Sequence, residues 1–485
     1  MAQIKHILGK ITHSGLLNWL FFAFVALIPI QTRLVYFFTA SHINKTFIFY
    51  NTLFFYLSDL VLVIVLLFWV LGLILGKFHV KQTLGGPSVR IFGVFLIITL
   101  FSIVVSRQTI SLLSYFGLFR LFIGFLLICF ILNIMNVKQM FHKVFWVLSV
   151  SSLFQILLGA WQYFNQKSLG LKILGEEYIR PYLSGIAKFK IPGGIRWSLE
   201  ELAGVSRETD FVMRPYGTFP HPNVFGAFLV AVSIITIYLL LVSRETWKKW
   251  LLSLILFGQI FGLSLSYSRV AIASWIIAFL VWLAVFNMKQ IKKKFQLTAE
   301  EKQGMRKVII LVFVSGIICL ALFYPLYLER AGIVSYGTTN QQAISERGLY
   351  QKIALQMIVR KPLTGVGFQN FVLSMDQYSP WVLKPGEHQP VHNIYLLVAA
   401  ETGILGFAVF ILFLGFIANT VWRKGLNKIS ATLFTILSAF LFIGFFDHYL
   451  LTIQQGRLLF FLVAGLLVAS VSVNEEEMSS AAELG

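Results

Sequence analysis

The residues best suited to chemistry in this sequence are a few arginines and one histidine at the ends of long apolar runs. Arg214 opens the segment RPYGTFPHPN, which leads into an apolar run from position 222. Its prolines fix φ and remove donors, and Asn223 is a candidate cap for the helix that follows. Arg214 would then stand beside a helix N-terminus, a place that suits an anion. The alternative is a helix entry at the membrane interface with a snorkelling arginine.

Four further arginines stand in notable places. Arg269 ends the tight SYSR turn between two apolar runs, so it must lie near a membrane interface. Arg120 stands inside an apolar run, where a charge costs enough for function to be the first hypothesis and a bundle salt bridge the alternative. Arg347 and Arg360 bracket a helix-like, partly amphipathic stretch that we expect to lie on or against the membrane face.

His392 begins the segment HNIYLLVAAETG, which enters another apolar run. An imidazole is largely neutral near pH 7 and accepts a proton, so His392 can serve as a general base or as a polar contact. The alternative for a single histidine at a helix entry is a structural role. Asn393 is a second candidate cap, and Glu401 would lie about two turns deeper in the helix.

Several familiar motifs are missing from the sequence. The external segments predicted below carry no DxD pair, no HExxH and no His/Cys cluster, so we expect no metal site and no cofactor. The segment RKPLTGVGFQNF from Arg360 lacks the Lys-Ser/Thr ending of a phosphate loop, and no strand precedes it. Its glycines at positions 365 and 367 are better interpreted as a turn that ends a surface helix. No GxSxG elbow is present.

Composition determines the class of protein that positions these residues. Of 485 residues, 58% are hydrophobic and 12% charged, and the mean hydropathy is +0.80. These values exclude a water-soluble fold. The net charge of +20 lies mainly at helix ends and in loops, which indicates contact with anionic membrane lipids rather than nucleic acid. Cys129 and Cys319 fall inside apolar runs and are expected to be buried.

The apolar runs predict an all-α, polytopic transmembrane bundle of about twelve helices, forming one integral membrane domain over residues 1–485. Runs that are apolar on every face exclude a transmembrane barrel. The expected spans are 14–31, 58–76, 90–106, 112–134, 144–163, 222–242, 250–266, 270–287, 308–327, 393–418, 429–447 and 456–473.

The charges of the connecting loops predict the orientation. Alternate short connections are rich in Lys and Arg, and such loops face the cytoplasm. Both ends of the chain are then cytoplasmic, including a short acidic tail at 474–485. The two long segments, 164–221 and 328–392, lie outside. The four residues Arg214, Arg269, Arg347 and His392 would gather on this outer face.

Arginines at a membrane surface, with one histidine and few acids, suit a lipid-linked diphosphate. A guanidinium fork holds phosphate oxygens in pairs and can stabilise the charge that develops on a diphosphate leaving group. His392 could take the proton from an incoming hydroxyl.

The motifs resemble those of the O-antigen ligase and O-antigen polymerase superfamily of bacterial envelope glycosyltransferases. The resemblance runs from position 57 through the final helices, and it is carried by RPYGTFPHPNVFGAF, SYSR, ERGLYQKIALQMIVRKPLTGVGFQNF, VHNIYLLVAAETGILG and FDHYLLTIQQGRLLF. It implies a bundle of about a dozen helices in the bacterial cytoplasmic membrane. The implied reaction moves a glycan from a polyprenyl (undecaprenyl) diphosphate carrier to an acceptor on the external face, without a metal and with inversion at the anomeric carbon.

The resemblance also implies roles for single residues. Arg214 and Arg347 would engage the diphosphate with support from Arg269, and His392 would act as base or orient the acceptor. Arg120 matches more loosely as a further diphosphate contact.

Members of the superfamily use a lipid A core, a glycan repeat unit or a protein as acceptor. A single large loop between the ninth and tenth helices that ends in HN favours a ligase, with a polymerase as the alternative. A transporter or flippase of an anion or lipid-linked sugar is the alternative from another class. Intramembrane acids would favour it, and the sequence offers essentially none.

Overall fold

The structure, a computed structural model, describes residues 13–77, 86–106, 111–134, 137–190, 211–287, 297–331 and 339–471. Within these residues, nine helices are long and apolar enough to cross a membrane, and three shorter apolar helices accompany them. Each matches one predicted span, so the prediction of an all-α polytopic bundle is confirmed. The twelve are α2 (His13–Leu27), α3 (Leu57–Ile74), α4 (Pro87–Ser106), α5 (Ser111–Ile134), α6 (Val137–Asn165), α8 (Pro222–Val242), α9 (Thr246–Leu265), α10 (Arg269–Asn287), α12 (Ala299–Ala331), α15 (Ile394–Lys424), α16 (Lys428–Gly444) and α18 (Gln454–Ser470).

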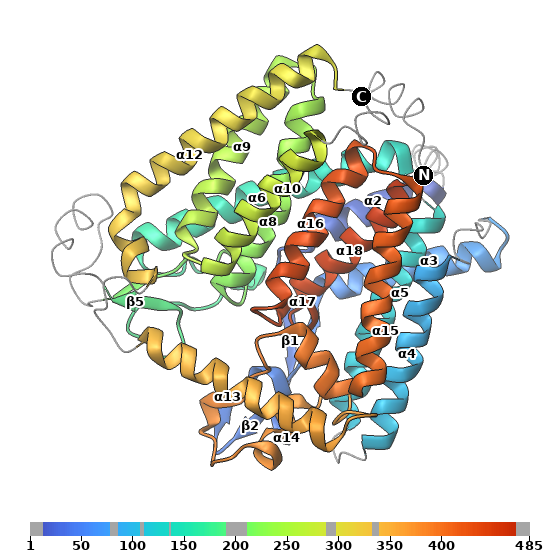
Figure 1. The fold of residues 1–485 in the computed structure, drawn as a ribbon, viewed down its shortest axis with the longest axis vertical. Helices are drawn as coiled ribbons and strands as arrows, with labels where there is room; N and C mark the ends of the chain where they lie inside the picture. The colour runs from blue at the N-terminus through green and yellow to red at the C-terminus, as the bar shows by residue number, and fades with distance from the viewer. Residues whose placement is uncertain are drawn as a thin grey trace, which may run out of the picture.

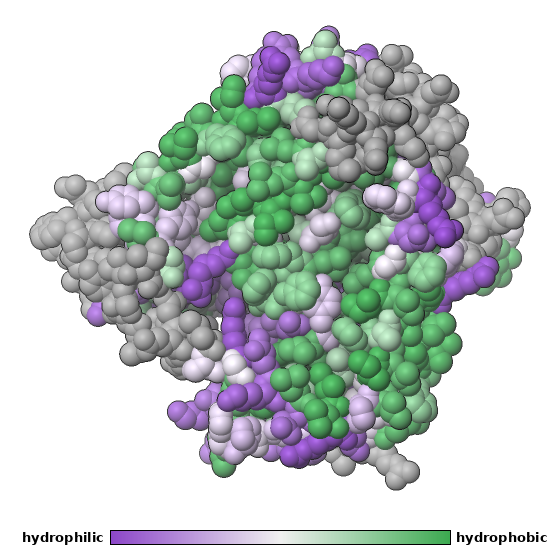
Figure 2. Space-filling view, viewed as in Figure 1, coloured by the Kyte–Doolittle hydropathy of each residue, from purple (hydrophilic) through white to green (hydrophobic). Residues whose placement is uncertain are grey.

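The helix α8 forms the centre of the bundle. It packs against α6, α9, α10, α12 and α16, and the apolar stretch that would cross the membrane is 100% buried in the protein. In the outer helices α3 and α12, by contrast, only 33% and 28% of the apolar stretch is buried. Figure 2 shows the resulting hydrophobic surface between polar regions at the two ends of the molecule. An apolar exterior of this extent is stable only against lipid.

Short elements gather at one end of the bundle, where β1, β2, α13 and α14 lie together (Figure 1). The strands pair as antiparallel hairpins, β1 with β4, β2 with β3 and β5 with β6. The elements are β1 (Arg33–Tyr36), β2 (His42–Ile43), β3 (Thr46–Phe47), β4 (Leu53–Tyr56), β5 (Lys188–Lys190), β6 (Phe211–Met213), α13 (Thr339–Arg360), α14 (Phe371–Tyr378) and α17 (Tyr449–Thr452), with 3-10 turns at Thr39–Ser41, Phe49–Asn51, Lys172–Leu174 and Pro385–Glu387.

The amphipathic helix predicted in the second long segment is α13. Leu349, Ile353 and Met357 are buried against α14 and α15, whereas Leu355 and Val359 are 52% and 72% exposed. The helix therefore has one face packed on the protein and apolar side chains on another, as a helix at a membrane surface would have.

The glycines after α13 dock the chain onto a break in α15. Gly403 interrupts that helix with φ 70° and ψ −178°, a conformation that is essentially restricted to glycine. Gly365 also has a positive φ, of 64°. The amide of Val366 donates to the carbonyl of Ala400 at 2.9 Å. The interpretation of these glycines as a structural turn is confirmed.

Other expectations have mixed outcomes. Cys129 and Cys319 are buried, as predicted. The helices α6 and α12 are longer than the predicted spans because their polar ends continue the helix. The tail at 474–485, positions 191–210 of the first long segment and positions 332–338 of the second lie outside the described residues. The side on which each end of the bundle lies stays a prediction.

Candidate active site

Arg214 is held inside the protein just before α8. Its Nε donates to the carbonyl of Ser266 at 2.6 Å, and its Nη2 donates to Oδ1 of Asn223 at 2.8 Å. The residue is only 3% exposed, which contradicts the alternative of an arginine reaching out to head groups. Burial, followed by the nearby guanidinium of Arg330, lowers the pKa of Arg214 well below its ordinary value.

The cap of α8 is His221, so the prediction that Asn223 caps this helix was wrong. Nδ1 of His221 accepts the amide of Asn223 at 3.1 Å. The side chain of Asn223 instead joins two charged groups, because it accepts from Arg214 and donates to Oδ2 of Asp447 at 3.0 Å. At α15, by contrast, Asn393 is the cap, as predicted.

Asp447, between α16 and α17, connects Asn223 to a pair of histidines. Its Oδ1 accepts the amide of His448 at 2.9 Å, and its carboxylate lies within 4.8 Å of ring nitrogens of both His392 and His448. The two imidazoles meet edge to face at 5.0 Å between centroids. Tyr350 of α13 stacks on His392 at 5.8 Å. A polar chain therefore runs from Arg214 through hydrogen bonds to Asn223 and Asp447, and a ring nitrogen of His392 lies within 4.8 Å of the Asp447 carboxylate at its end.

The electrostatics leave His392 able to accept a proton. Burial lowers its pKa below the ordinary value of 6.5, and Asp447 opposes the shift. Burial also lowers the pKa of His448 and of His221, each to about 3. Burial alone would raise the pKa of Asp447, but the three histidines and the Asn223 hydrogen bond lower it. Nδ1 of His392 is buried and has no hydrogen-bond partner among the described residues.

Arg330 and Arg269 stand near Arg214, and Arg347 stands near both of them. Arg330, at the end of α12, donates from Nε to the carbonyl of Tyr267 at 3.3 Å, in the turn that also binds Arg214. Arg269 and Arg347 act electrostatically on Arg330. The structure thus brings together the predicted residues Arg214, Arg269 and Arg347, and it adds Arg330. Arg330 follows the ninth predicted span, at the end predicted to be external, and sequence reasoning missed this signal.

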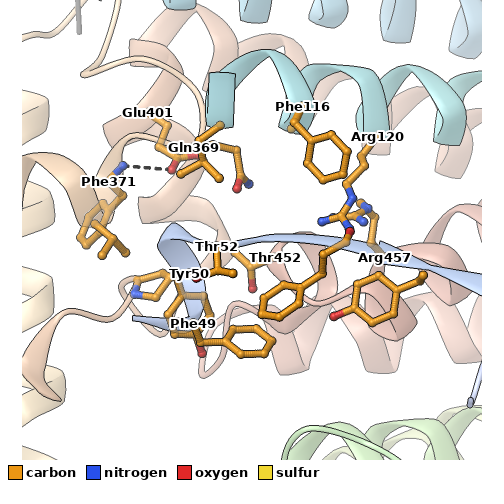
Figure 3. Close-up of a pocket in the computed structure, with 16 residues that line it drawn as sticks. Phe49, Tyr50, Thr52, Phe116, Arg120, Gln369, Phe371, Glu401, Thr452 and Arg457 are labelled. Atoms are coloured by element: carbon orange, nitrogen blue, oxygen red, sulfur yellow. Dashed lines mark hydrogen bonds between the residues drawn. The ribbon is translucent and has the colours of Figure 1, made fainter. Parts of the chain in front are cut away.

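Arg120 lies in a different cluster. It forms an ion pair with Asp59 at 3.6 Å, donates to the carbonyl of Phe54 and packs over the ring of Phe116 at 4.4 Å. Arg457 of α18 is its basic neighbour (Figure 3). The salt-bridge alternative for Arg120 is therefore present, with a partner from α3 rather than from its own helix.

The group of His392, Asp447 and His448 could hold a metal ion by distance alone. Sequence reasoning did not find it, because His392 is far from the other two in the chain. Both oxygens of Asp447 already accept hydrogen bonds from Asn223 and the His448 amide, and Arg214 and Arg347 act on the same residues. Because the arginines already make this region positively charged, it suits a bound anion better than a metal cation.

These features define a multi-pass membrane protein with a buried, arginine-rich site at one end of its helices. Residues 253–411, from α9 into α15, match the family model described as O-antigen ligase. No curated protein matches the chain. The match confirms the resemblance to the O-antigen ligase superfamily and supports a glycosyltransferase-like activity in polysaccharide biosynthesis, with a lipid-linked glycan and an acceptor as partners. Arg269, Arg330, Arg347 and His392 fall within the matched segment, and Arg214 precedes it.

Proposed function

We propose that the protein is a ligase-type glycosyltransferase that moves a glycan from a polyprenyl diphosphate carrier to an acceptor on the external face of the cytoplasmic membrane. The observation that carries this proposal is the polar chain from Arg214 to His392. It joins a guanidinium that can hold a diphosphate to an imidazole that can take a proton.

In the proposed reaction, an acceptor hydroxyl oxygen attacks the anomeric carbon of the donor glycan. The new carbon–oxygen bond forms as the bond to the diphosphate breaks, and the departing electron pair stays on the diphosphate. Arg214 and Arg347, with Arg269 and Arg330 nearby, stabilise that charge. His392 takes the hydroxyl proton, and Asp447 stabilises the imidazolium that results. Attack opposite the leaving group inverts the anomeric carbon.

We infer that this reaction needs no metal ion, because the guanidinium groups can provide the charge that a metal would otherwise supply. Transfer should therefore persist after treatment with EDTA. A loss of activity that added Mg²⁺ or Zn²⁺ restores would contradict this inference.

The choice of a ligase over a polymerase rests on the single large segment between α12 and α15, which contains α13 and ends at His392. A polymerase remains the second candidate, because the reaction would be the same and only the molecule that bears the acceptor hydroxyl would differ. The transporter alternative gains little from Glu401, the buried acid of α15. Its carboxylate accepts the amide of Phe371 at 3.3 Å and so holds the start of α14.

The test uses purified protein in liposomes with a polyprenyl diphosphate glycan and separate candidate acceptors. Growth of the glycan on its carrier would identify a polymerase, and movement to a lipid A core or to a protein would identify a ligase. Absence of transfer with every acceptor would favour the transporter.

Two variants examine the site in the same assay. His392→Ala and Arg347→Ala should each lower transfer at least about 100-fold, as expected when a proton acceptor or a charge-stabilising donor is removed. Arg360→Ala is the matched control, because Arg360 lies exposed at the far end of α13 from Arg347. Retained transfer by His392→Ala would exclude the histidine from the mechanism.

A further inference from the structure

A second polar pocket lies next to the candidate active site, and the proposed reaction leaves it unused. Aromatic residues of the β1–β4 hairpin and α5 form much of its wall, with Arg120 and Arg457 together at one end and Gln369 and Glu401 at the other (Figure 3). Its volume of about 40 Å³ compares with roughly 10–15 Å³ for one water. It therefore admits a group the size of a phosphate or a carboxylate, but not a whole sugar ring.

The charges at the arginine end do not cancel. Arg120 and Arg457 share one carboxylate, that of Asp59, which Arg120 contacts directly and Arg457 reaches through Gln454. Nε of Arg120 is buried and has no hydrogen-bond partner among the described residues. A buried donor that lacks a partner is costly, and more so when it is charged, so an anion placed there would relieve that cost.

The opposite end of the pocket does not supply the missing anion. Glu401 is committed to the amide of Phe371, and Gln369 lies between it and the arginines in Figure 3. The Arg120–Arg457 end thus remains a cationic recess with apolar walls, formed by Tyr56 and Phe116 among others. Such walls exclude water and strengthen the attraction of an anion to the guanidinium groups.

His448 contacts residues that line the pocket on one side and His392 on the other. The hydroxyl of Thr452, which lines the pocket, lies 2.6 Å from Nδ1 of His448. The ring of Tyr50, which also lines it, meets the His448 ring at 5.2 Å. Since His448 in turn packs on His392, a molecule with its reacting hydroxyl at His392 could extend past His448 into the recess.

We propose that this pocket binds an anionic substituent, a phosphate or a carboxylate, on the acceptor saccharide. The proposal rests on the proposed function, because it takes His392 as the place where the acceptor hydroxyl reacts. Two arginine clusters then flank the reaction centre. Arg214 and its neighbours hold the diphosphate of the donor, and Arg120 with Arg457 selects an acidic acceptor.

A transfer assay tests the proposal through acceptor preference. Neutral acceptors are compared with the same acceptors bearing a sugar phosphate or a uronic acid, which separates the two sources of negative charge. We expect the wild type to prefer an acidic acceptor in kcat/KM, and Arg120→Gln to reduce that preference about tenfold or more. Arg120→Lys keeps the positive charge but lacks the forked guanidinium, so it should restore part of the preference for the acidic acceptor.

The ratio of kcat/KM for the two acceptors is the decisive quantity, because a variant that folds poorly lowers both values equally. Arg360→Gln is the control, because Arg360 is exposed and does not line the pocket. If transfer persists and this ratio is unchanged in both Arg120→Gln and Arg457→Gln, the pocket does not bind the acceptor's anionic group. The proposed function would still stand.

A binding measurement separates the pocket from the donor site without any transfer. Saturation-transfer NMR on the protein in nanodiscs would compare glucose 6-phosphate and glucuronate with glucose. The anionic sugars should give the stronger signals, which Arg120→Gln removes and Arg347→Ala retains. The reverse pattern would place the anion at the donor arginines and overturn the proposal. Retained binding in a protein that transfers nothing would support the pocket while the proposed function failed.

Discussion

At the scale of single residues, the protonation state of His392 leads to a pH prediction. Burial, and then Arg347, lower its pKa from 6.5, whereas Asp447 and Glu346 raise it. Because the net pKa is lower, His392 stays neutral and able to accept a proton until the pH falls below 6.5. The acid limb of kcat/KM should therefore lie below that value in a pH profile of glycan transfer.

The same electrostatics predict the effect of removing the carboxylate at position 447. Asp447→Asn deletes the charge that raises the pKa of His392, so the acid limb should move to still lower pH, while the maximal rate falls because the imidazolium loses its counter-charge. His388→Gln offers a comparison, since His388 pairs with Asp376 away from this site. An acid limb above pH 6.5, or one that Asp447→Asn leaves in place, would contradict the role of His392 as base.

The residues of the site were predictable from sequence only in part. Arg214, Arg269, Arg347 and His392 could be placed on one face because loop charge and the alternation of helices relate distant helix ends. Asn223 was misassigned because the preference of asparagine for caps is local, and nothing local shows that its side chain faces both Arg214 and Asp447. The contacts of Asp447 and His448 with His392 depend on how α15 packs against α16 and α18, which sequence patterns do not reveal.

At the scale of elements, the break in α15 should control how firmly the chain after α13 is held. A Cβ at Gly403 would collide with the carbonyl of Leu363, and the backbone there has a conformation that other residues avoid. We expect Gly403→Ala to destabilise the protein by roughly 1–3 kcal/mol and to lower transfer, because the displaced chain joins α14 to α13, which carries Arg347 and Tyr350. Thermal unfolding in detergent measures the first effect.

Gly415→Ala is the matched control in the same helix, because a Cβ there meets nothing within 4 Å. It should leave the melting temperature unchanged or raise it slightly, since alanine favours helix over glycine by about 0.5–1 kcal/mol. Equal melting temperatures for the two variants would show that the break does not depend on glycine.

Helix positions were predictable because each span is a continuous apolar run, and the prediction succeeded for all twelve apolar helices in the described part of the chain. Polar helix ends were not, as α12 shows. It begins at Ala299 with a charged turn that hydropathy alone excludes from the helix. The cap at Asn393 was predictable, since its side chain accepts only from amides two and three residues ahead.

At the scale of the whole molecule, the proposed function requires α13 and His392 to lie on the external side of the membrane. Cysteine labelling can test this, because Cys129 and Cys319 are buried and should react little with an impermeant maleimide. Val382 is 94% exposed in the segment before α15, so it reports on the end of the bundle that carries the candidate active site. Gln303 is exposed near the start of α12, so it reports on the opposite end of the bundle. Val382→Cys should be labelled in intact right-side-out vesicles, and Gln303→Cys only after lysis.

The reverse labelling pattern would have consequences beyond topology. A polyprenyl diphosphate glycan presented externally could not reach Arg214 or His392 from the cytoplasmic side, so transfer to an external acceptor would be impossible whatever the chemistry of the site. The basic loops would then face outward, against the charge bias that orients helical membrane proteins. Labelling of both variants in intact vesicles would show that the vesicles leak, which the protection of a cytoplasmic marker protein excludes in advance. Labelling of Val382→Cys alone places the arginine-rich site where the donor is available.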